Sequence, residues 1–164
     1  MNQTLKRTLH YVSWALVLVV VILAVLLAGV RLVGLTPYTV LSGSMEPVYP
    51  VGSLIYVRAA EPESIAVGDA ITFRMSGQTV ATHRVIEIDS ENRRFYTQGD
   101  ANDVPDGAPV PFENLIGRPI LCIPRLGYLS SYISSPPGLY VAAACAVFIL
   151  LLSLLAERRP KQAK

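Results

Sequence analysis

The chain has 164 residues, 52% of them hydrophobic, with a mean hydropathy of +0.44 and a net charge of +2 at pH 7. It is too apolar for an ordinary small water-soluble domain, and it carries no basic patch of the kind that binds nucleic acid. The apolar residues are concentrated at the two ends, whereas the middle, Pro37 to Tyr132, holds seven arginines, eleven acids and no lysine. The composition therefore indicates a membrane-anchored chain with a mildly acidic middle domain.

Residues 11–30 form an uncharged apolar run, about as long as a helix needs to cross a hydrocarbon core of about 30 Å. A cleavable signal peptide is the alternative, since Lys6 and Arg7 would form its basic start. The apolar core of such a peptide is shorter, about 7–15 residues. We therefore expect a retained membrane anchor at residues 11–34.

A second uncharged apolar run covers residues 139–156. Its length predicts a C-terminal transmembrane helix, which spans residues 133–156 together with a short preceding segment, and a buried core helix is the alternative. The residues before it, Gly127–Gly138, include Tyr128 and Tyr132, whose amphipathic rings suit a membrane interface. A plain loop into the helix fits the same residues equally well.

Basic residues flank the outer ends of the two runs: Lys6, Arg7, Arg158, Arg159, Lys161 and Lys164. Because basic residues favour the cytoplasmic side of a membrane, we expect both termini to be cytoplasmic, as tails of residues 1–10 and 157–164. The middle domain, residues 35–132, is then extracytoplasmic. The sequence thus predicts a multi-pass protein of the cell membrane, or of the endoplasmic reticulum membrane if the organism is eukaryotic.

The middle domain alternates short β-prone runs with turns rich in glycine, proline, asparagine and aspartate. Four runs stand out, at residues 53–57, 70–74, 79–88 and 93–98. Strands at this spacing predict a mainly β fold class, with a small all-β domain that the two apolar runs would hold between an N-terminal and a C-terminal transmembrane helix. The polar loop Gly99–Pro111 follows the last run, and loops on a β scaffold commonly carry chemistry.

One histidine limits what a nucleophilic serine in this domain can use as its base. Ser42, Gly43 and Ser44 place two hydroxyls about a flexible glycine, and His83 is the only histidine between Pro37 and Tyr132. A serine hydroxyl needs an adjacent general base, and histidine is the side chain best suited to that role near neutral pH. If Ser44 is a nucleophile, its base is therefore His83, although a single strand histidine is more often structural.

Three aspartates, Asp100, Asp103 and Asp106, share the polar loop. One of them could orient the imidazole and stabilise its charged form, as in a serine–histidine–aspartate site, while turn formation is the alternative role of each. That alternative is strongest for Asp103, which follows Asn102. The other histidine of the chain, His10, precedes the first apolar run and is not part of the middle domain, so we expect neither a metal site nor a cofactor.

Four motifs then occur in order: SGSMEP at 42–47, THRV at 82–85, GDANDVPD at 99–106 and LIGR at 115–118. Together they resemble the ordered sequence boxes of type I signal peptidases, from about Val40 to Leu126. The histidine resembles the branch of that family found in archaea, in the endoplasmic reticulum and in some Gram-positive bacteria. The absence of lysine from the middle domain independently argues against the other branch, whose base is lysine.

The resemblance implies a role for each of five residues. Ser44 is the nucleophile, His83 the general base and Asp106 the carboxylate that orients the imidazole. Asp100 is a second, supporting carboxylate, and Ser42 supplies an oxyanion-hole hydroxyl. The family pattern carries an adjacent pair of aspartates where this chain has a proline and Asp106, so the division of roles between Asp100 and Asp106 stays open.

The function implied by the resemblance is a membrane-bound serine endopeptidase, a type I signal peptidase that removes N-terminal signal peptides from secreted preproteins at the extracytoplasmic membrane surface. Its partners would be signal peptides, the lipid bilayer and, as candidates, the translocon or accessory subunits. We expect shallow apolar pockets lined by the strands at 54–57 and 70–73. The alternatives are a catalytically silent, membrane-anchored subunit of a secretion complex and a related protease dedicated to one precursor.

Overall fold

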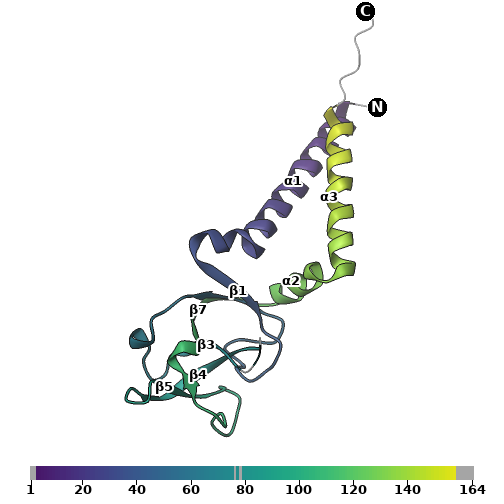
Figure 1. Ribbon diagram of the computed structural model, residues 1–164. Coiled ribbons are helices and arrows are strands. Elements are labelled where there is room, and N and C mark those ends of the chain that lie inside the picture. The colour runs from purple at the N-terminus through teal and green to yellow at the C-terminus, as the bar shows by residue number, and fades with distance from the viewer. Residues whose placement is uncertain (1–2, 76, 78, 158–164) are drawn as a thin grey trace, which may run out of the picture. The chain divides into compact units, whose positions relative to one another are not determined.

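The computed structural model describes residues 3–75, 77 and 79–157, and the chain divides into two compact units. One unit combines the two ends of the chain, Met1–Gly29 and Tyr132–Lys164, and the other is the continuous segment Val30–Ser131 (Figure 1). The basic residues at 158–164, on which the orientation prediction partly depends, lie outside the described residues.

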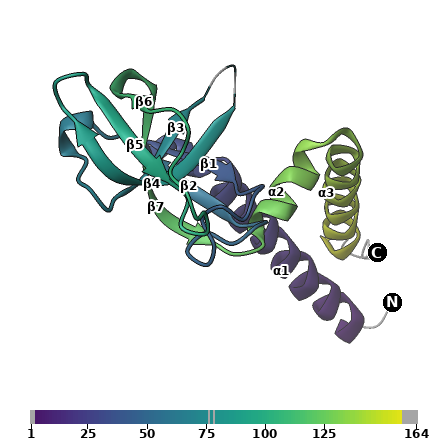
Figure 2. The ribbon, with the colours of Figure 1, turned by 90° about the horizontal axis from the view of Figure 1, so that it is seen from below.

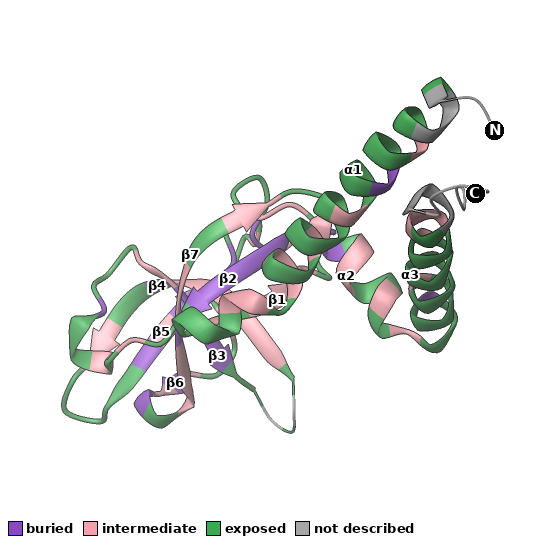
Figure 3. Cartoon of the chain, turned by 90° about the horizontal axis from the view of Figure 1, so that it is seen from above, coloured by how far each residue is buried: buried purple, intermediate pink, exposed green. Residues whose placement is uncertain are grey.

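The terminal unit consists mainly of two long apolar helices, α1 (Gln3–Leu27) and α3 (Pro136–Glu157), which pack against each other. Within them, residues 7–27 and 136–154 are long and apolar enough to cross a membrane. Most of their described side chains are exposed (Figure 3), including large apolar ones such as Trp14 and Phe148. Helices that expose apolar side chains on most sides suit a lipid environment.

The middle unit is a seven-stranded antiparallel sheet in the order β1-β2-β7-β3-β4-β5-β6, which curls upon itself (Figure 2). Its strands are β1 (Leu35–Thr39), β2 (Leu54–Arg58), β3 (Ala70–Arg74), β4 (Val80–Asp89), β5 (Arg94–Gln98), β6 (Val110–Pro111) and β7 (Leu115–Ile123). Short 3-10 helices lie at Gly29–Val33, Pro62–Ser64 and Phe112–Asn114, and α2 is Leu126–Ser134. The fold is therefore mainly β with an apolar helix at each end, as expected.

The core of the sheet explains why these runs form strands. Four consecutive residues of β2, 54–57, are buried, so both faces of that central strand are covered. A second cluster gathers on β3, β4 and β5 around Ile71, Val85 and Phe95, with Phe95 stacked on Phe112 at a ring distance of 4.4 Å. Each fully buried side chain of this size stabilises the fold by about 1.5–3 kcal/mol.

The four expected strands match β2, β3, β4 and β5 to within one residue at each end. Strands β1, β6 and β7 were not predicted as strands. Each contains a proline, which weakens a strand pattern, and the two residues of β6 were assigned to the polar loop Gly99–Pro111. Pro37 is tolerated since β1 is an edge strand, and Pro119 lies beside a register shift in the β2–β7 ladder. The segment 126–134 is a helix, so its interpretation as a plain loop was wrong.

Candidate active site

Strand β4 brings His83 into the centre of the sheet, opposite Ile71 of β3. Its imidazole lies edge-on to the Phe73 ring at 6.2 Å, and its side chain is 16% exposed. Because consecutive strand residues point to opposite faces, Arg84 leaves β4 on the other side. The histidine is thus held by a rigid element and presented to a loop on each side of it.

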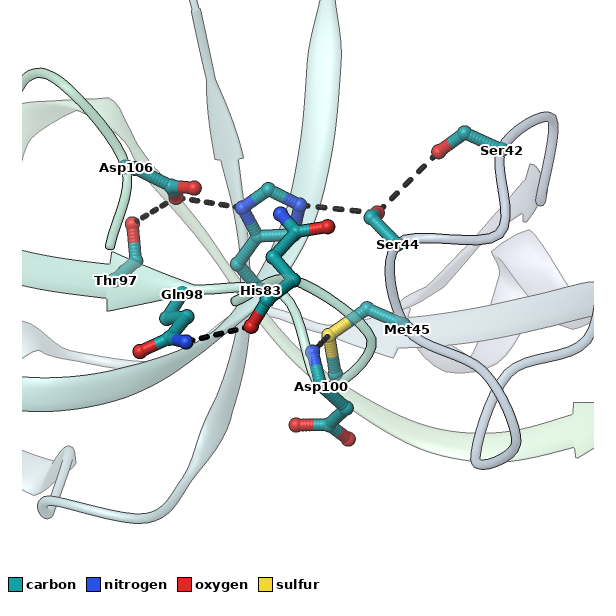
Figure 4. A network of polar contacts seen from close by, with 9 residues as sticks. Ser42, Ser44, Met45, His83, Thr97, Gln98, Asp100 and Asp106 are labelled. Carbon is teal, nitrogen blue, oxygen red and sulfur yellow. Dashed lines mark hydrogen bonds and ion pairs between the residues drawn. The ribbon is translucent and has the colours of Figure 1, made fainter. Parts of the chain in front are cut away.

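Ser44, His83 and Asp106 form one hydrogen-bonded line (Figure 4). His83 Nδ1 lies 2.6 Å from Asp106 Oδ2, and His83 Nε2 lies 3.0 Å from Ser44 Oγ. With its proton on Nδ1, the imidazole donates to the carboxylate, and Nε2 accepts from the serine hydroxyl. This is the arrangement that allows an imidazole to take the proton of a serine as the serine attacks.

The loop that carries Ser44 is folded tightly around its neighbours. The Glu46 amide donates to the Gly43 carbonyl at 3.0 Å, the Tyr49 amide donates to the Met45 carbonyl at 2.9 Å, and Met45 itself is buried. Ser42 Oγ lies 3.3 Å from Ser44 Oγ. A second hydroxyl is therefore within reach of the oxygen that would attack and of any negative charge that develops beside it.

The polar loop after β5 is bonded to the Ser44 loop through its backbone. The Ala101 amide donates to the Ser44 carbonyl at 2.9 Å, and the Asp100 amide approaches Met45 Sδ at 3.5 Å. A Cβ atom added at Gly99 would lie 2.5 Å from the Ser44 carbonyl oxygen, well inside van der Waals contact. Only glycine lets the two loops come this close.

The Asp100 carboxylate lies apart from the imidazole and pairs with Arg84. Arg84 Nε and Nη2 donate to its two oxygens at 2.7 and 2.6 Å, and Nη1 donates to the Gly68 carbonyl at 2.7 Å. These bonds to Asp100 raise the pKa of Arg84 above its ordinary value. The structure therefore brings together Ser42, Ser44, His83 and Asp106, places Asp100 on the guanidinium, and leaves Asp103 exposed.

Thr97 is a site residue that the sequence did not indicate. Its Oγ1 donates to Asp106 Oδ2 at 2.6 Å, and its carbonyl accepts from the Asp106 amide at 2.8 Å. Threonine is common in strands, so its presence in β5 gave no signal of this contact. Only the three-dimensional pairing of β5 with the loop reveals it.

A cleft of about 790 Å³ opens beside Ser44 and His83. Its described lining comes from the end of β1 and the following loop, from the start of β4, and from single residues elsewhere: residues 38–42, 44, 45, 49, 55, 75 and 79–83. Of the residues in the two strands expected to line the cleft, 54–57 and 70–73, only Ile55 does so. The rest of that prediction was wrong. The neighbours of Ile55 in β2, as well as Ile71 and Phe73, are buried in the core instead.

No group of three or more histidine, cysteine, aspartate or glutamate side chains that could hold a metal ion occurs within residues 3–75, 77 and 79–157. The polar groups that Ser42, Ser44, His83 and Asp106 bring together are hydroxyls, an imidazole and a carboxylate. Their geometry suits acyl transfer through a serine nucleophile.

Comparison with known proteins points to peptidases. Residues 12–92 match the family described as signal peptidase, peptidase S26. Signal peptidase I W of Bacillus subtilis is 42% identical over 85 residues, which are 50% of this chain and 45% of that protein. A catalytic subunit of the signal peptidase complex, from dog and from human alike, is 28% identical over 125 residues, 68% of this chain and 65% of each relative. The matched region thus spans from about half to just under two thirds of these relatives.

Proposed function

Because the chain belongs to the signal peptidase family, peptidase S26, we propose that it is a membrane-bound serine endopeptidase that removes N-terminal signal peptides from secreted preproteins. The observation that carries this proposal is the line from Ser44 Oγ through the His83 imidazole to Asp106, with bonds of 3.0 and 2.6 Å. A nucleophile, a base and a group that orients the base are the parts that serine acyl transfer requires.

In the first half of the reaction, Ser44 Oγ attacks the carbonyl carbon of the scissile peptide bond while His83 Nε2 takes the hydroxyl proton. The Asp106 carboxylate stabilises the imidazolium that forms, and the Ser42 hydroxyl with nearby backbone amides stabilises the oxyanion. His83 then gives its proton to the leaving amine. The C–N bond breaks, the mature protein leaves, and the signal peptide stays joined to Ser44 as an ester.

In the second half, His83 accepts a proton from a water molecule that attacks the ester carbonyl. The bond to Ser44 Oγ breaks, the serine regains its proton from the imidazolium, and the signal peptide leaves with a new carboxyl group. Asp100 has a supporting role in this proposal, because its backbone touches the Ser44 loop and its side chain binds Arg84, the residue after the base.

The lining of the cleft supports short apolar side chains as the preferred substrate groups. Val40, Ile55 and Ala81 line it together with the catalytic serine and histidine. Signal peptides present small residues in an A-x-A-like pattern at their cleavage site, after an apolar core that enters the membrane. Small side chains at these two substrate positions fit a shallow apolar cleft, and large ones do not.

The proposed location is the extracytoplasmic surface of the membrane. Residues 7–27 and 136–154 are candidate membrane spans, and the chain between Leu27 and Ser44 is short, so the serine need not lie far from the bilayer surface. We propose a multi-pass topology with both termini cytoplasmic and the unit Val30–Ser131 outside. The partners would be preproteins and lipid, with the translocon or accessory subunits as further candidates.

The test is cleavage of a preprotein by the full chain in liposomes, with the new N-terminus identified by mass spectrometry. The wild type should cut at one site, and His83→Ala should lose at least about a thousandfold in rate with its fold intact. Replacing the small residues at the two substrate positions by leucine should stop cleavage. A wild type that cuts no preprotein would contradict the proposal and favour a silent subunit, whereas cutting one partner alone would indicate a dedicated protease.

A further inference from the structure

We propose that Thr97 is a positioning residue of the catalytic site, which acts by fixing the Asp106 carboxylate so that one chosen oxygen serves His83. This inference rests on the proposed function, because it assigns how the orienting carboxylate of that mechanism is itself held. Thr97 is not among the described residues that line the cleft, and its hydroxyl donates to Asp106, so we expect its effect on the reaction to pass through Asp106.

Asp106 needs such a partner because of where it lies in the chain. It belongs to the irregular loop between β5 and β6, and its side chain is 22% exposed. A loop residue has more conformational freedom than a strand residue, and a carboxylate can turn either oxygen toward a donor. Without restraint, the His83 Nδ1 proton would meet a carboxylate in several orientations.

Thr97 removes that freedom at two points. Its carbonyl accepts from the Asp106 amide at 2.8 Å, which fixes the backbone of the loop residue, and its hydroxyl donates to Asp106 Oδ2 at 2.6 Å, which fixes the side chain. Thr97 itself is rigid, because it lies in β5 and is 1% exposed. A β-branched side chain in a strand also has few rotamers, so the hydroxyl is already in place before His83 becomes charged.

The oxygen that Thr97 binds is the one that His83 uses. Both Thr97 Oγ1 and His83 Nδ1 lie 2.6 Å from Asp106 Oδ2 (Figure 4). Hydrogen bonds to an ionised carboxylate are about twice as strong as neutral ones, so the hydroxyl holds this oxygen firmly. The bond from His83 strengthens when the imidazole gains a proton during attack, and a carboxylate already aimed at Nδ1 stabilises that state without reorganising.

The chain offers a matched control for the loss of a buried threonine hydroxyl. Thr72 of β3 is fully buried, and its Oγ1 is hydrogen-bonded to Thr82 Oγ1 at 2.8 Å, away from Asp106. Thr72→Val and Thr97→Val remove the same group from the same sheet, and each leaves a partner with one bond fewer. Only the second change alters the orientation of the catalytic carboxylate.

The experiment measures kcat and KM for preprotein cleavage by the full chain in liposomes, with thermal unfolding of each variant. Thr97→Val should lower kcat by about tenfold or more with KM within about twofold, because the lost bond acts in the transition state. Thr97→Ser, which keeps the hydroxyl, should retain kcat within about threefold of the wild type. Thr72→Val should lower the unfolding temperature and lower kcat much less than Thr97→Val does, although its partner Thr82 lines the cleft.

Two results would overturn the inference: a folded Thr97→Val with wild-type kcat, or a folded Thr97→Ser whose kcat falls as far as that of Thr97→Val. If Thr97→Val does not fold, a folded Thr97→Ser whose kcat falls by about tenfold or more overturns the inference by itself. Failure of the proposed function looks different, because the wild type itself would then cleave no preprotein.

Discussion

Each face of β4 carries a basic side chain paired with an aspartate, and we infer that the two pairs have different roles. His83 and Arg84 are neighbours in sequence, point to opposite faces, and each binds an aspartate from the same loop, Asp106 and Asp100. On the cleft face His83 shares one carboxylate oxygen with a threonine, while its other nitrogen reaches Ser44. On the other face the arginine binds both oxygens of its aspartate.

The comparison shows how an irregular loop, the one between β5 and β6, is held in a defined position. A single contact with the histidine would leave the loop free to pivot about that contact. The bidentate pair on the opposite face, together with the Gly68 carbonyl bound by Arg84, fixes the loop at a second point. We infer that the cleft face moves protons and that the opposite face holds the loop, and substitutions on each face should separate the two roles.

The largest expected effect is on the cleft face. Asp106→Asn keeps the shape of the side chain but removes the charge that stabilises the imidazolium, so kcat should fall by about 10³–10⁴-fold. The unfolding temperature should change much less than in a variant with a disrupted core. Steady-state cleavage kinetics and circular dichroism melting measure the two quantities, and a variant that keeps a tenth of wild-type kcat would show that Asp106 does not have this role.

The next effect tests the close approach between the two loops. A Cβ at Gly99 would lie 2.5 Å from the Ser44 carbonyl, so Gly99→Ala should push the Ser44 loop away from His83. We expect a loss of about 1–3 kcal/mol in the free energy of unfolding, with a clear fall in kcat. Gly107→Ala is the control, since nothing lies within 4 Å of its added Cβ. Equal behaviour of the two variants in melting and cleavage would refute the steric argument.

A smaller effect is expected on the opposite face. Asp100→Asn weakens the bidentate bond to Arg84, which should reduce the free energy of unfolding by about 1–3 kcal/mol and kcat by about tenfold, through displacement of the loop. The control is Glu63→Gln, because the Glu63–Arg93 pair is mostly exposed, at 3.4 Å, and such pairs contribute little. A thousandfold loss of kcat in a stably folded Asp100→Asn would instead place Asp100 in the chemistry itself.

The smallest effect is expected for a substitution in the turn between β4 and β5, which lies outside both aspartate pairs. The Asp89 carboxylate accepts from the Asn92 amide at 3.0 Å and from Asn92 Nδ2 at 2.8 Å, and these bonds lower the pKa of Asp89. A lowered folded-state pKa stabilises the fold when the pH is above the unfolded-state pKa. This stabilisation is lost as the pH falls through the folded-state pKa. The difference in melting temperature between wild type and Asp89→Asn should thus be full at neutral pH and vanish in acid, with kcat unchanged.

A difference that persisted at the lowest pH would mean that the turn is stabilised by something other than the charge. A fall in kcat at neutral pH would mean that the turn communicates with the cleft, which would weaken the distinction between the two faces of β4. Thermal melts across an acid pH series and one cleavage assay at neutral pH are sufficient.

Much of this arrangement could be predicted from residue types alone. The only histidine of the middle domain had to be the base if Ser44 is a nucleophile, and the four longest β-prone runs became β2, β3, β4 and β5. The pairing of Asp106 with His83 came from the resemblance to a known family, since spacing did not distinguish it from Asp100. The structure separates the two aspartates by their partners.

The remaining features depend on contacts that sequence patterns do not contain. Strands β1 and β7 were obscured by Pro37 and Pro119, which are tolerated at a sheet edge and beside a register shift. The lining of the cleft was misplaced because side chains of β2 and β3 are covered on both faces of the sheet. Thr97 gave no signal because a hydrogen bond between a strand and a loop nine residues later has no local pattern.

The central claim, that Ser44 is the nucleophile activated by His83, is tested most directly by comparing two serines whose hydroxyl oxygens lie 3.3 Å apart. Cleavage of a preprotein in liposomes should be lost in Ser44→Ala, by at least about a thousandfold, because Ser44 Oγ is the hydroxyl hydrogen-bonded to His83 Nε2. Ser42→Ala should keep the reaction at a rate reduced by about 10²–10³-fold or less, as for the loss of one oxyanion donor. Cleavage that survives Ser44→Ala, or that is lost only in Ser42→Ala, would contradict the account.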